Sequence, residues 1–386
     1  MKFTTTTDNL QTALRKVSNS AAKKDCAQPL LATIMVEASN GNVRLYATDG
    51  DIFTSAALNA AVLEDGRTAI PAKNFCDIVN TQQAGDVEIS CDEGGSTLKF
   101  TCHKVKYSIN VLKAADFPSA PAFNEECAFT VEGRELVDNI KHVAYARSND
   151  DARKGLDGIY FLIEDGVWVV VASDAKRLAL VEHALQNPVE AAGNGAGAVE
   201  GATGTGSDVP AVERRSFILP PRTAMEVISI VDQSKPVRVR MSQSSVVFEN
   251  DTTVMYSKLM PFTYPNFRSV IPNSFMHQVS IPRALFHDVL KRAEAVAGSS
   301  DKSVALDIQS AQMGISTSSD SGSFIESIDV ELEGEPVKIA VSPTFLDDPL
   351  KVMGCDKIVI KYNNACTPIE VTGEPGFIYI LMPMRD

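Results

Sequence analysis

The sequence has little of what would hold a metal ion or a disulfide framework. Its seven cysteines are an odd number, none is spaced as Cys-x-x-Cys, and its five histidines occur singly. We therefore expect reduced cysteines that act as small apolar residues, no metal ion and no cofactor. No apolar run approaches the ~20 residues of a membrane helix, and Met1 and Lys2 lead into polar sequence. These features predict no membrane partner, no signal peptide and a cytoplasmic location.

Catalytic motifs are also lacking. There is no HExxH, no GxSxG and no acid pair spaced for glycosidase chemistry. The glycine run 193–198 superficially resembles a dinucleotide fingerprint, but it follows no predicted strand and opens no predicted helix. We expect a protein that is not an enzyme. A rival hypothesis, an enzyme that uses Asp and Ser chemistry on a repeated scaffold, requires a base beside a nucleophile, and we can name no such pair.

Positive charge is in deficit. Lys and Arg number 36 against 49 Asp and Glu, so the formal net charge is −13. A nucleic-acid-binding domain usually carries a broad basic surface, and this chain does not have the composition for one. Any contact with DNA is therefore expected to be local and confined to one face.

What the sequence does contain is a segment written three times. A short strand beginning near Phe3, Phe129 or Val279 is followed each time by a helix-period segment with one apolar stripe. The stripes contain Leu10, Leu14 and Val17; Leu136, Ile140 and Val143; and Phe286, Val289 and Ala293. A second strand–helix opening follows in each copy, at 68–79, 217–231 and 337–350. Three equivalent pairs of openings predict three equivalent domains.

The predicted domains are 1–125, 126–270 and 271–386, and the second contains an insertion at 190–211. The insertion is rich in Gly and Ala and has no Lys, Arg or aromatic residue, so we expect a flexible surface loop. Elsewhere strand propensity dominates, with about two helices per domain. The pattern predicts an α+β fold in which helices cover one face of antiparallel sheets.

Basic residues recur on the polar faces of the predicted helices. For any one helix, a solvated surface is the simplest interpretation. Because equivalent helices occupy equivalent places, the recurrence favours a shared basic lining through which a DNA duplex could pass. The residues concerned are Arg15, Lys16, Lys73, Lys141, Arg222 and Lys291.

The C-terminal segment 378–386 stays apolar almost to its end. Ile378 to Leu381 read as a last core strand. Met382, Pro383 and Met384 continue past it, and exposed methionines suit adaptable peptide-binding surfaces. Both interpretations remain open.

Several stretches make the chain resemble the beta sliding clamps, the processivity subunits of bacterial DNA polymerase III. They are the opening Met1-Lys2-Phe3-Thr4, the linker 114–118, the segment Ser173-Asp174-Ala175-Lys176-Arg177-Leu178-Ala179, the segments 257–259 and 264–267, and the ending Met382-Pro383-Met384-Arg385. The resemblance covers essentially the whole chain outside the insertion. It implies three domains of the DNA-clamp type, with antiparallel sheets outside and two helices per domain on the inner face.

The resemblance also implies a function. Two copies would close head to tail into a ring around double-stranded DNA, as a homodimer that confers processivity on the replicative polymerase. DNA polymerase subunits, the clamp loader and other clamp-motif repair and replication proteins would insert a short motif with apolar anchors into a cleft. The alternative is a specialised clamp paralogue that acts mainly as a peptide- or inhibitor-binding protein.

Individual residues match positions with roles in that family. The matches to the peptide-binding cleft are Arg153, Leu156, Ser173, Lys176, Arg177, Leu178, Pro265, Val270, Pro343, Ile380, Met382, Pro383 and Met384. The matches to DNA-facing positions are Lys24, Lys73, Asn149, Lys154 and Arg222. The matches to the dimer interface are Tyr107, Ile109, Ala297 and Gly298.

Some residues depart from the family pattern. The usual Thr-Asp-Gly-His-Arg-Leu stretch has Ala175 and Lys176 at its centre, which alters the cleft wall. Ser269 stands where an arginine is common, and Lys154-Gly155 replaces an aromatic pair near the DNA path. Ala297 and Gly298 supply less apolar bulk than usual at the interface.

Overall fold

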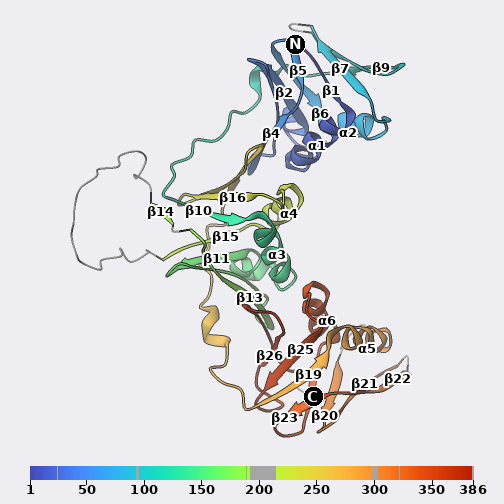
Figure 1. Cartoon of the computed structure of the whole chain (residues 1–386), viewed down its shortest axis with the longest axis vertical. Helices are drawn as coiled ribbons and strands as arrows, with labels where there is room; N and C mark the ends of the chain where they lie inside the picture. Colours follow the sequence, from blue (N-terminus) through green and yellow to red (C-terminus); the bar gives the residue numbers. More distant parts are fainter. Residues whose placement is uncertain are drawn as a thin grey trace, which may run out of the picture. The chain divides into compact units, whose positions relative to one another are not determined.

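The computed structural model describes residues 1–23, 25–92, 95–187, 189–191, 214–297, 303–320 and 322–384 (Figure 1). The chain divides into two compact units. The first contains Met1–Val137, Gln186–Asp208 and Arg222–Leu259, and the second contains Asp138–Leu185, Val209–Pro221 and Met260–Asp386. We call them unit 1 and unit 2.

Within the residues that the structure describes, a strand leads into a helix within two residues six times. These pairs are β1 (Lys2–Thr6) with α1 (Thr7–Val17), β6 (Gly66–Pro71) with α2 (Ala72–Asn80), β10 (Cys127–Glu132) with α3 (Gly133–Ala144), β15 (Arg215–Leu219) with α4 (Pro221–Ile230), β19 (His277–Pro282) with α5 (Arg283–Val296) and β24 (Val337–Val341) with α6 (Pro343–Val352). They stand at the three predicted repeat openings and at the three predicted second openings. The helices and the antiparallel strands confirm the predicted α+β fold.

Local side-chain contacts mark where α1 begins. In α1 the Thr6 hydroxyl accepts a hydrogen bond from the Asn9 backbone N–H at 3.3 Å, which caps the helix. Asp8 lies in the first turn and Arg15 and Lys16 in the last, so the side-chain charges complement the helix dipole. α1 therefore starts where the strand ends, and its direction is set by a few side chains.

Unit 1 contains a nine-stranded and a five-stranded antiparallel sheet. The larger has the order β14-β10-β16-β17-β18-β4-β3-β2-β6, and the smaller has the order β5-β1-β7-β8-β9. The strands not yet defined are β2 (Thr33–Ser39), β3 (Asn42–Thr48), β4 (Ile52–Leu58), β5 (Ala61–Glu64), β7 (Asp86–Cys91), β8 (Thr97–Cys102), β9 (Val105–Asn110), β14 (Glu190–Ala191), β16 (Pro236–Met241), β17 (Ser245–Glu249) and β18 (Thr253–Lys258). Side chains of α1, α2 and both sheets form one core that includes Leu10, Phe75 and Phe100.

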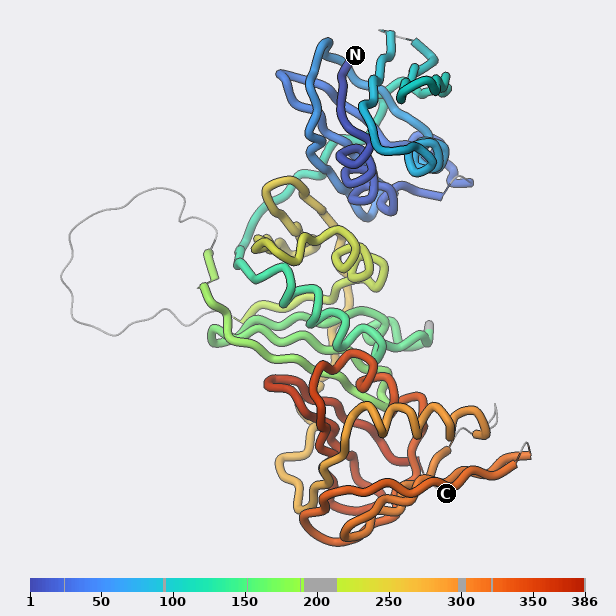
Figure 2. Tube along the Cα trace, turned by 45° about the vertical axis from the view of Figure 1, so that its right-hand side comes forward, coloured from blue at the N-terminus to red at the C-terminus, as the bar shows by residue number. Residues whose placement is uncertain are grey.

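Unit 2 repeats this plan. Its nine-stranded sheet has the order β15-β11-β12-β13-β27-β26-β25-β19-β23, and its four-stranded sheet has the order β22-β21-β20-β24. The further strands are β11 (Ile159–Glu164), β12 (Val167–Ser173), β13 (Arg177–Ala184), β20 (Val304–Ile308), β21 (Gln312–Ser319), β22 (Gly322–Asp329), β23 (Glu331–Glu333), β25 (Lys357–Tyr362), β26 (Ile369–Thr372) and β27 (Phe377–Leu381). The helices α5 and α6 lie side by side (Figures 1 and 2).

Both nine-stranded sheets contain the same junction. The last strand of a second half pairs with the third strand after the first helix of the preceding repeat, as β18 with β4 and β27 with β13. The registers are equivalent, because Tyr256 lies opposite Phe53 and Ile380 lies opposite Leu178. Each junction therefore joins two successive repeats in one sheet.

A tight turn beside each junction is also repeated. The Thr48 hydroxyl donates to the Ile52 carbonyl at 2.7 Å, and the Ser173 hydroxyl donates to the Arg177 carbonyl at the same distance. In both turns the next aspartate accepts two backbone N–H groups. The third residue has a positive φ, +98° at Gly50 and +71° at Ala175.

Part of the predicted insertion is in a strand. Glu190 and Ala191 form β14, which pairs with β10, and the Glu190 carboxylate lies 2.8 Å from the Arg238 guanidinium. Residues 192–211 lie outside the described residues.

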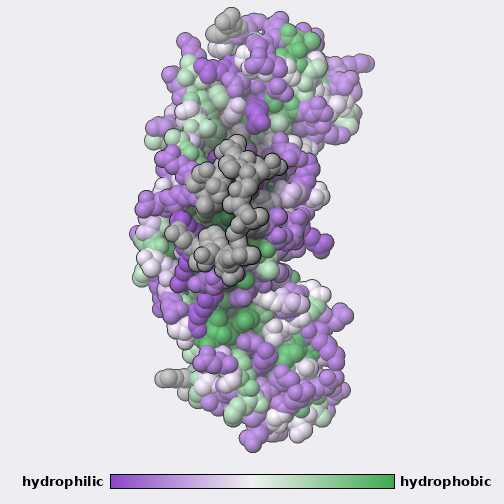
Figure 3. Space-filling view, turned by 60° about the vertical axis from the view of Figure 1, so that its left-hand side comes forward, coloured by the Kyte–Doolittle hydropathy of each residue, from purple (hydrophilic) through white to green (hydrophobic). Residues whose placement is uncertain are grey.

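The surface carries mostly polar side chains on the face drawn in Figure 3, where apolar side chains gather only in small areas. Among the helices that the structure describes, none combines the length and the hydropathy of a membrane span. Nowhere in the described ranges do three His, Cys, Asp or Glu side chains gather as a metal site requires.

Candidate functional site

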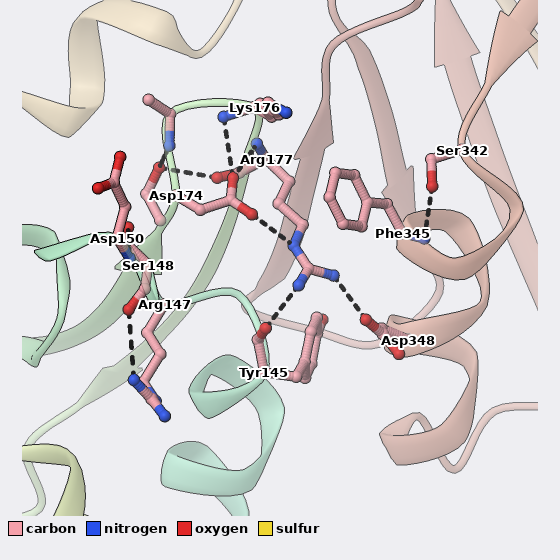
Figure 4. Close-up of polar contacts among 12 residues, drawn as sticks. Tyr145, Arg147, Ser148, Asp150, Asp174, Lys176, Arg177, Ser342, Phe345 and Asp348 are labelled. Atoms are coloured by element: carbon pink, nitrogen blue, oxygen red, sulfur yellow. Dashed lines mark hydrogen bonds and ion pairs between the residues drawn. The ribbon is translucent and has the colours of Figure 1, made fainter. Parts of the chain in front are cut away.

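The second repeated turn contains Arg177, whose guanidinium donates hydrogen bonds to three other residues (Figure 4). Its Nε donates to the Asp174 carboxylate at 3.1 Å, Nη1 donates to the Asp348 carboxylate at 2.6 Å and Nη2 donates to the Tyr145 carbonyl at 2.7 Å. It also lies 4.2 Å from the centre of the Phe345 ring. Only 9% of the side chain is exposed. We call the turn 173–178, together with Arg153 and the C-terminal residues 382–384, the Arg177 surface.

These contacts give Arg177 a structural role. Asp174 belongs to its own turn, Tyr145 follows α3, and Phe345 and Asp348 lie on α6. One cation therefore joins the end of β12 to a helix some 170 positions away, with two carboxylates to neutralise it. Its hydrogen-bonding capacity is largely used within the chain, so it offers a ligand little beyond the edge of its guanidinium.

Burial keeps the neighbouring phenols neutral. It raises the pKa of Tyr145, Tyr264 and Tyr379 well above the ordinary value for tyrosine. The Tyr264 ring stacks on Tyr160 with 4.6 Å between ring centres. The buried residues near Arg177 are thus aromatic and uncharged.

The predicted apolar residues separate into buried support and exposed surface. Leu156, Leu178 and Ile380 belong to one apolar cluster, in which Leu178 and Ile380 are each only 2% exposed. Val270, Met382 and Met384 are 50%, 44% and 37% exposed. A ligand would therefore meet the latter group, while the former holds the strands in place.

The C-terminal residues are tied to this surface through the backbone. The Met382 N–H donates to the Lys176 carbonyl at 3.0 Å, and the Met384 N–H donates to the Ala340 carbonyl at 2.8 Å. The structure thus supports both interpretations of the tail, a core strand to Leu381 and a surface segment beyond it.

Basic side chains border the turn. The Arg153 guanidinium donates to the Asp174 carbonyl at 2.8 Å and lies 3.6 Å from the Asp150 carboxylate. The Lys176 side chain is exposed. Contacts therefore bring together Arg153, Ser173, Lys176, Arg177 and Met382.

The remaining predicted cleft residues are less directly joined. Pro265 is exposed next to the stacked Tyr264, Val270 ends the short helix Phe267–Val270, and Pro383 is half-buried. Pro343 is buried in the first turn of α6.

Sequence reasoning missed Tyr145, Asp174, Phe345 and Asp348. Only Asp174 had a local signal, because it lies within the resembling segment. Phe345 and Asp348 meet Arg177 through pairing of β13 with β27, and Tyr145 meets it through packing at the end of α3, neither of which a local pattern reveals.

Two of the predicted DNA-facing residues lie near the short helix Ser18–Ser20 in unit 1. Arg222 donates to the Asn19 carbonyl at 3.0 Å and pairs with the Asp49 carboxylate. Lys73 and Asn19 both line a cavity of about 700 Å³. Lys73 and Arg222 each lie in the first turn of a helix.

The other predicted DNA-facing residues are Asn149, Lys154 and Lys24. Asn149 and Lys154 are exposed in unit 2. Lys24 lies outside the described residues. Lys16, predicted for the basic lining, is half-buried and donates to the Thr252 hydroxyl at 2.9 Å, and burial lowers its pKa.

Two of the predicted interface residues, Tyr107 and Ile109, lie on β9, which ends its sheet. Tyr107 is half-buried on β9, whereas the side chains of Ile109 and Ala297 are 6% and 4% exposed. Gly298 lies outside the described residues. Ile325, on the edge strand β22, was not predicted although it is 79% exposed.

Family models match both ends of the chain. The N-terminal domain of the DNA polymerase III beta subunit matches residues 1–121, and the C-terminal domain of the same subunit matches residues 268–385. Together the two matches span more than half of the chain.

Known proteins similar to this chain carry related names. The beta sliding clamp of Rickettsia bellii is 25% identical over 403 residues and that of Chlamydia muridarum is 22% identical over 386, with 99% or more of each sequence covered. The DNA polymerase III beta subunit of Thermotoga maritima superposes with a TM-score of 0.87 at 25% identity, over 100% of this chain and 99% of that one. A sliding clamp of Pseudomonas aeruginosa, solved bound to griselimycin, has a TM-score of 0.89 at 19% identity, with both chains covered completely.

Proposed function

The chain belongs to the family of DNA polymerase III beta subunits, the beta sliding clamps, and from this premise we propose that two copies close head to tail into a ring around duplex DNA. The ring would tether the replicative polymerase by enclosure, with no need for a tight grip on DNA. Such a role suits an acidic chain, because a net charge of −13 opposes static binding to a polyanion.

The observation that carries the proposal is the pairing rule of the two junctions. In each, the last strand of a second half meets the third strand after the first helix of a repeat. Two strands of these kinds remain, β9 and β22, and both end their sheets. A third junction between β9 of one copy and β22 of another would use both edges. Because the contact is heterologous, two such contacts close a two-membered ring.

The repeat comparison also gives this junction a register. Met384 and Leu112 are equivalent, since their N–H groups donate to Ala340 and Ala69 at the same place in β24 and β6. The β21–β22 hairpin matches β12–β13, with Ser318 opposite Ser323 as Ser173 is opposite Leu178. If the third junction has the same register as the pairing of β13 with β27, Phe324 of one copy lies opposite Tyr107 of the other, and Ile325 lies opposite Lys106.

Charge favours the same pairing. Lys104 and Lys106 lie on or next to β9, while Glu326 and Asp329 lie on β22. Opposite charges on facing strands stabilise a sheet and select its partner.

The predicted domains 1–125, 126–270 and 271–386 fit this arrangement as three repeats that share joined sheets. We further propose that Lys73 and Arg222, with Lys24, Asn149 and Lys154, face the DNA. Their separation over two units suits many weak contacts along a duplex, in place of one binding patch.

We propose that DNA polymerase subunits, the clamp loader and other clamp-motif replication and repair proteins bind the Arg177 surface. The exposed side chains of Met382, Met384 and Val270 supply adaptable apolar contact. In this account the protein has no catalytic step and needs no cofactor, and it works in the cytoplasm.

Light scattering across a dilution series tests ring formation. The expected particle has twice the mass of the 386-residue chain at high concentration and dissociates only on strong dilution. A monomer at every concentration would remove the ring.

A further inference from the structure

We propose that the Arg177 surface selects partner peptides with a carboxylate beside their apolar anchors, and that Lys176 is the residue that recognises it. This inference rests on the proposed use of the surface as the peptide-binding site. It assigns a chemical class to the peptide and a specificity role to one side chain.

The first argument comes from the equivalent junction in unit 1. There the Lys258 N–H donates to the Asp51 carbonyl at 3.0 Å, and the Lys258 ammonium lies 2.9 Å from the Asp51 carboxylate. In unit 2 the same backbone hydrogen bond joins Met382 to Lys176, also at 3.0 Å. The ion pair at one junction is thus replaced at the other by a methionine and a lysine.

The carboxylates near Lys176 are paired with other cations. Arg177 engages the carboxylates of Asp174 and Asp348, and Arg153 engages that of Asp150. Lys351 also pairs with Asp348, at 2.9 Å. Each of these carboxylates therefore already has a cation, and within the described residues none forms an ion pair with the exposed Lys176.

Lys176 also lies beside an exposed apolar side chain. Met382, joined to Lys176 through the backbone, is 44% exposed, so an apolar anchor and a cation are presented side by side. A peptide that covers the methionine with an apolar side chain brings its neighbouring residue towards Lys176. A carboxylate there would form the ion pair that Asp51 and Lys258 form in unit 1.

A matched set of peptides tests the inference. Fluorescein-labelled hexapeptides carry one leucine and one phenylalanine anchor, with aspartate or the isosteric asparagine before, between or after the anchors. Fluorescence anisotropy with the full-length protein gives their Kd values. For at least one position we expect the aspartate peptide to bind about two- to fivefold more tightly, the range of an exposed ion pair.

Two variants locate the effect. Lys176→Gln is expected to bring the aspartate-to-asparagine ratio to about one and to leave the Kd of the asparagine peptide unchanged. Lys291→Gln removes the same charge from an exposed position on α5 and is expected to keep the ratio. Raising the salt concentration should shrink the ratio, because exposed ion pairs are screened.

The outcomes separate the two proposals. If neither kind of peptide binds, the surface is not the peptide site and the proposed function loses that part. If both kinds bind with equal Kd at every position, or if the preference survives in Lys176→Gln, the inference is overturned while the peptide site stands.

Discussion

Ala175 holds a backbone conformation that costs an L-residue free energy. Its φ of +71° lies in the left-handed region, and the equivalent residue of the first turn is Gly50. In the folded state, this conformation costs a residue with a Cβ about 1–2 kcal/mol, and glycine avoids that cost. Glycine also makes the unfolded chain more flexible, which lowers the free energy of unfolding by about 0.5–1 kcal/mol and so offsets part of the gain. We therefore predict that Ala175→Gly stabilises the surrounding sheet by about 0.5–1 kcal/mol.

Trp168 provides the measurement. It is the only tryptophan of the chain and is buried on β12, the strand that leads into this turn. Urea unfolding followed by its fluorescence should show a higher midpoint for Ala175→Gly. An Ala172→Gly control, at a buried strand position, should lower it. An unchanged or lower midpoint for Ala175→Gly would contradict the assigned strain.

Glu226 carries a carboxylate that burial disfavours. It is 5% exposed, and its one hydrogen bond comes from Asn19 Nδ2 at 3.5 Å. Burial raises its pKa despite the opposing effects of Asn19 and Arg222. The folded state therefore holds this proton more tightly than the unfolded state, so stability is lost as pH rises above about 4.5.

We predict that Glu226→Gln, which cannot ionise, gains stability relative to the parent chain over that pH range. The difference should grow from pH 4.5 upward and level off once Glu226 is fully ionised. Urea unfolding by circular dichroism at several pH values measures it. If the free energy of unfolding changed with pH in the same way for the two proteins, burial would not disfavour the ionised Glu226 carboxylate, and the prediction would be wrong.

Arg177 marks the limit of residue-level prediction. Its type and its place in a resembling segment pointed to the peptide-binding cleft, which stays a prediction, and the structure shows its guanidinium in contact with Asp174 and Asp348. That the guanidinium is held by Asp348 and Phe345 could not be predicted, because those contacts depend on the pairing of β13 with β27.

At the scale of elements, the proposed third junction gives a charge test. Ile325 is expected to lie opposite Lys106 of the second copy. Ile325→Lys would put two like charges together and Ile325→Glu two opposite ones, in variants that are equally polar. Because a ring has two such contacts, we predict that the dimer Kd of Ile325→Lys exceeds that of Ile325→Glu by about tenfold or more.

Light scattering and analytical ultracentrifugation measure these Kd values, and circular dichroism checks that each monomer is folded. Lys106→Glu should rescue the Ile325→Lys variant. Equal Kd values for the two Ile325 variants, or the absence of rescue, would rule out this register.

The strand–helix openings were predictable because their signals are local. The apolar stripe of α1 through Leu10, Leu14 and Val17 and the cap at Thr6 need no distant partner. The joined sheets were not predictable, because β4 pairs with a strand some 200 residues further along the chain. The hydrogen bond of Lys16 was not predictable for the same reason, since Thr252, which accepts it, is brought near by that pairing.

At the scale of the whole molecule, the account separates retention on DNA from affinity for DNA. The chain is acidic, and the basic residues assigned to the DNA are few and spread over two units. A protein of this kind would leave DNA quickly if it bound only by charge. Enclosure removes that requirement, since a closed ring is lost only by opening or by sliding off an end.

The most direct measurement follows the protein on circular DNA after the circle is cut. The protein is loaded by a clamp loader onto nicked circles and separated from free protein by gel filtration, and the DNA is then linearised with a restriction enzyme. The account predicts that the protein stays with intact circles at salt concentrations that abolish charge-driven binding and leaves the linear molecules within minutes. Equal retention on circles and on linear DNA, or loss from both, would contradict it.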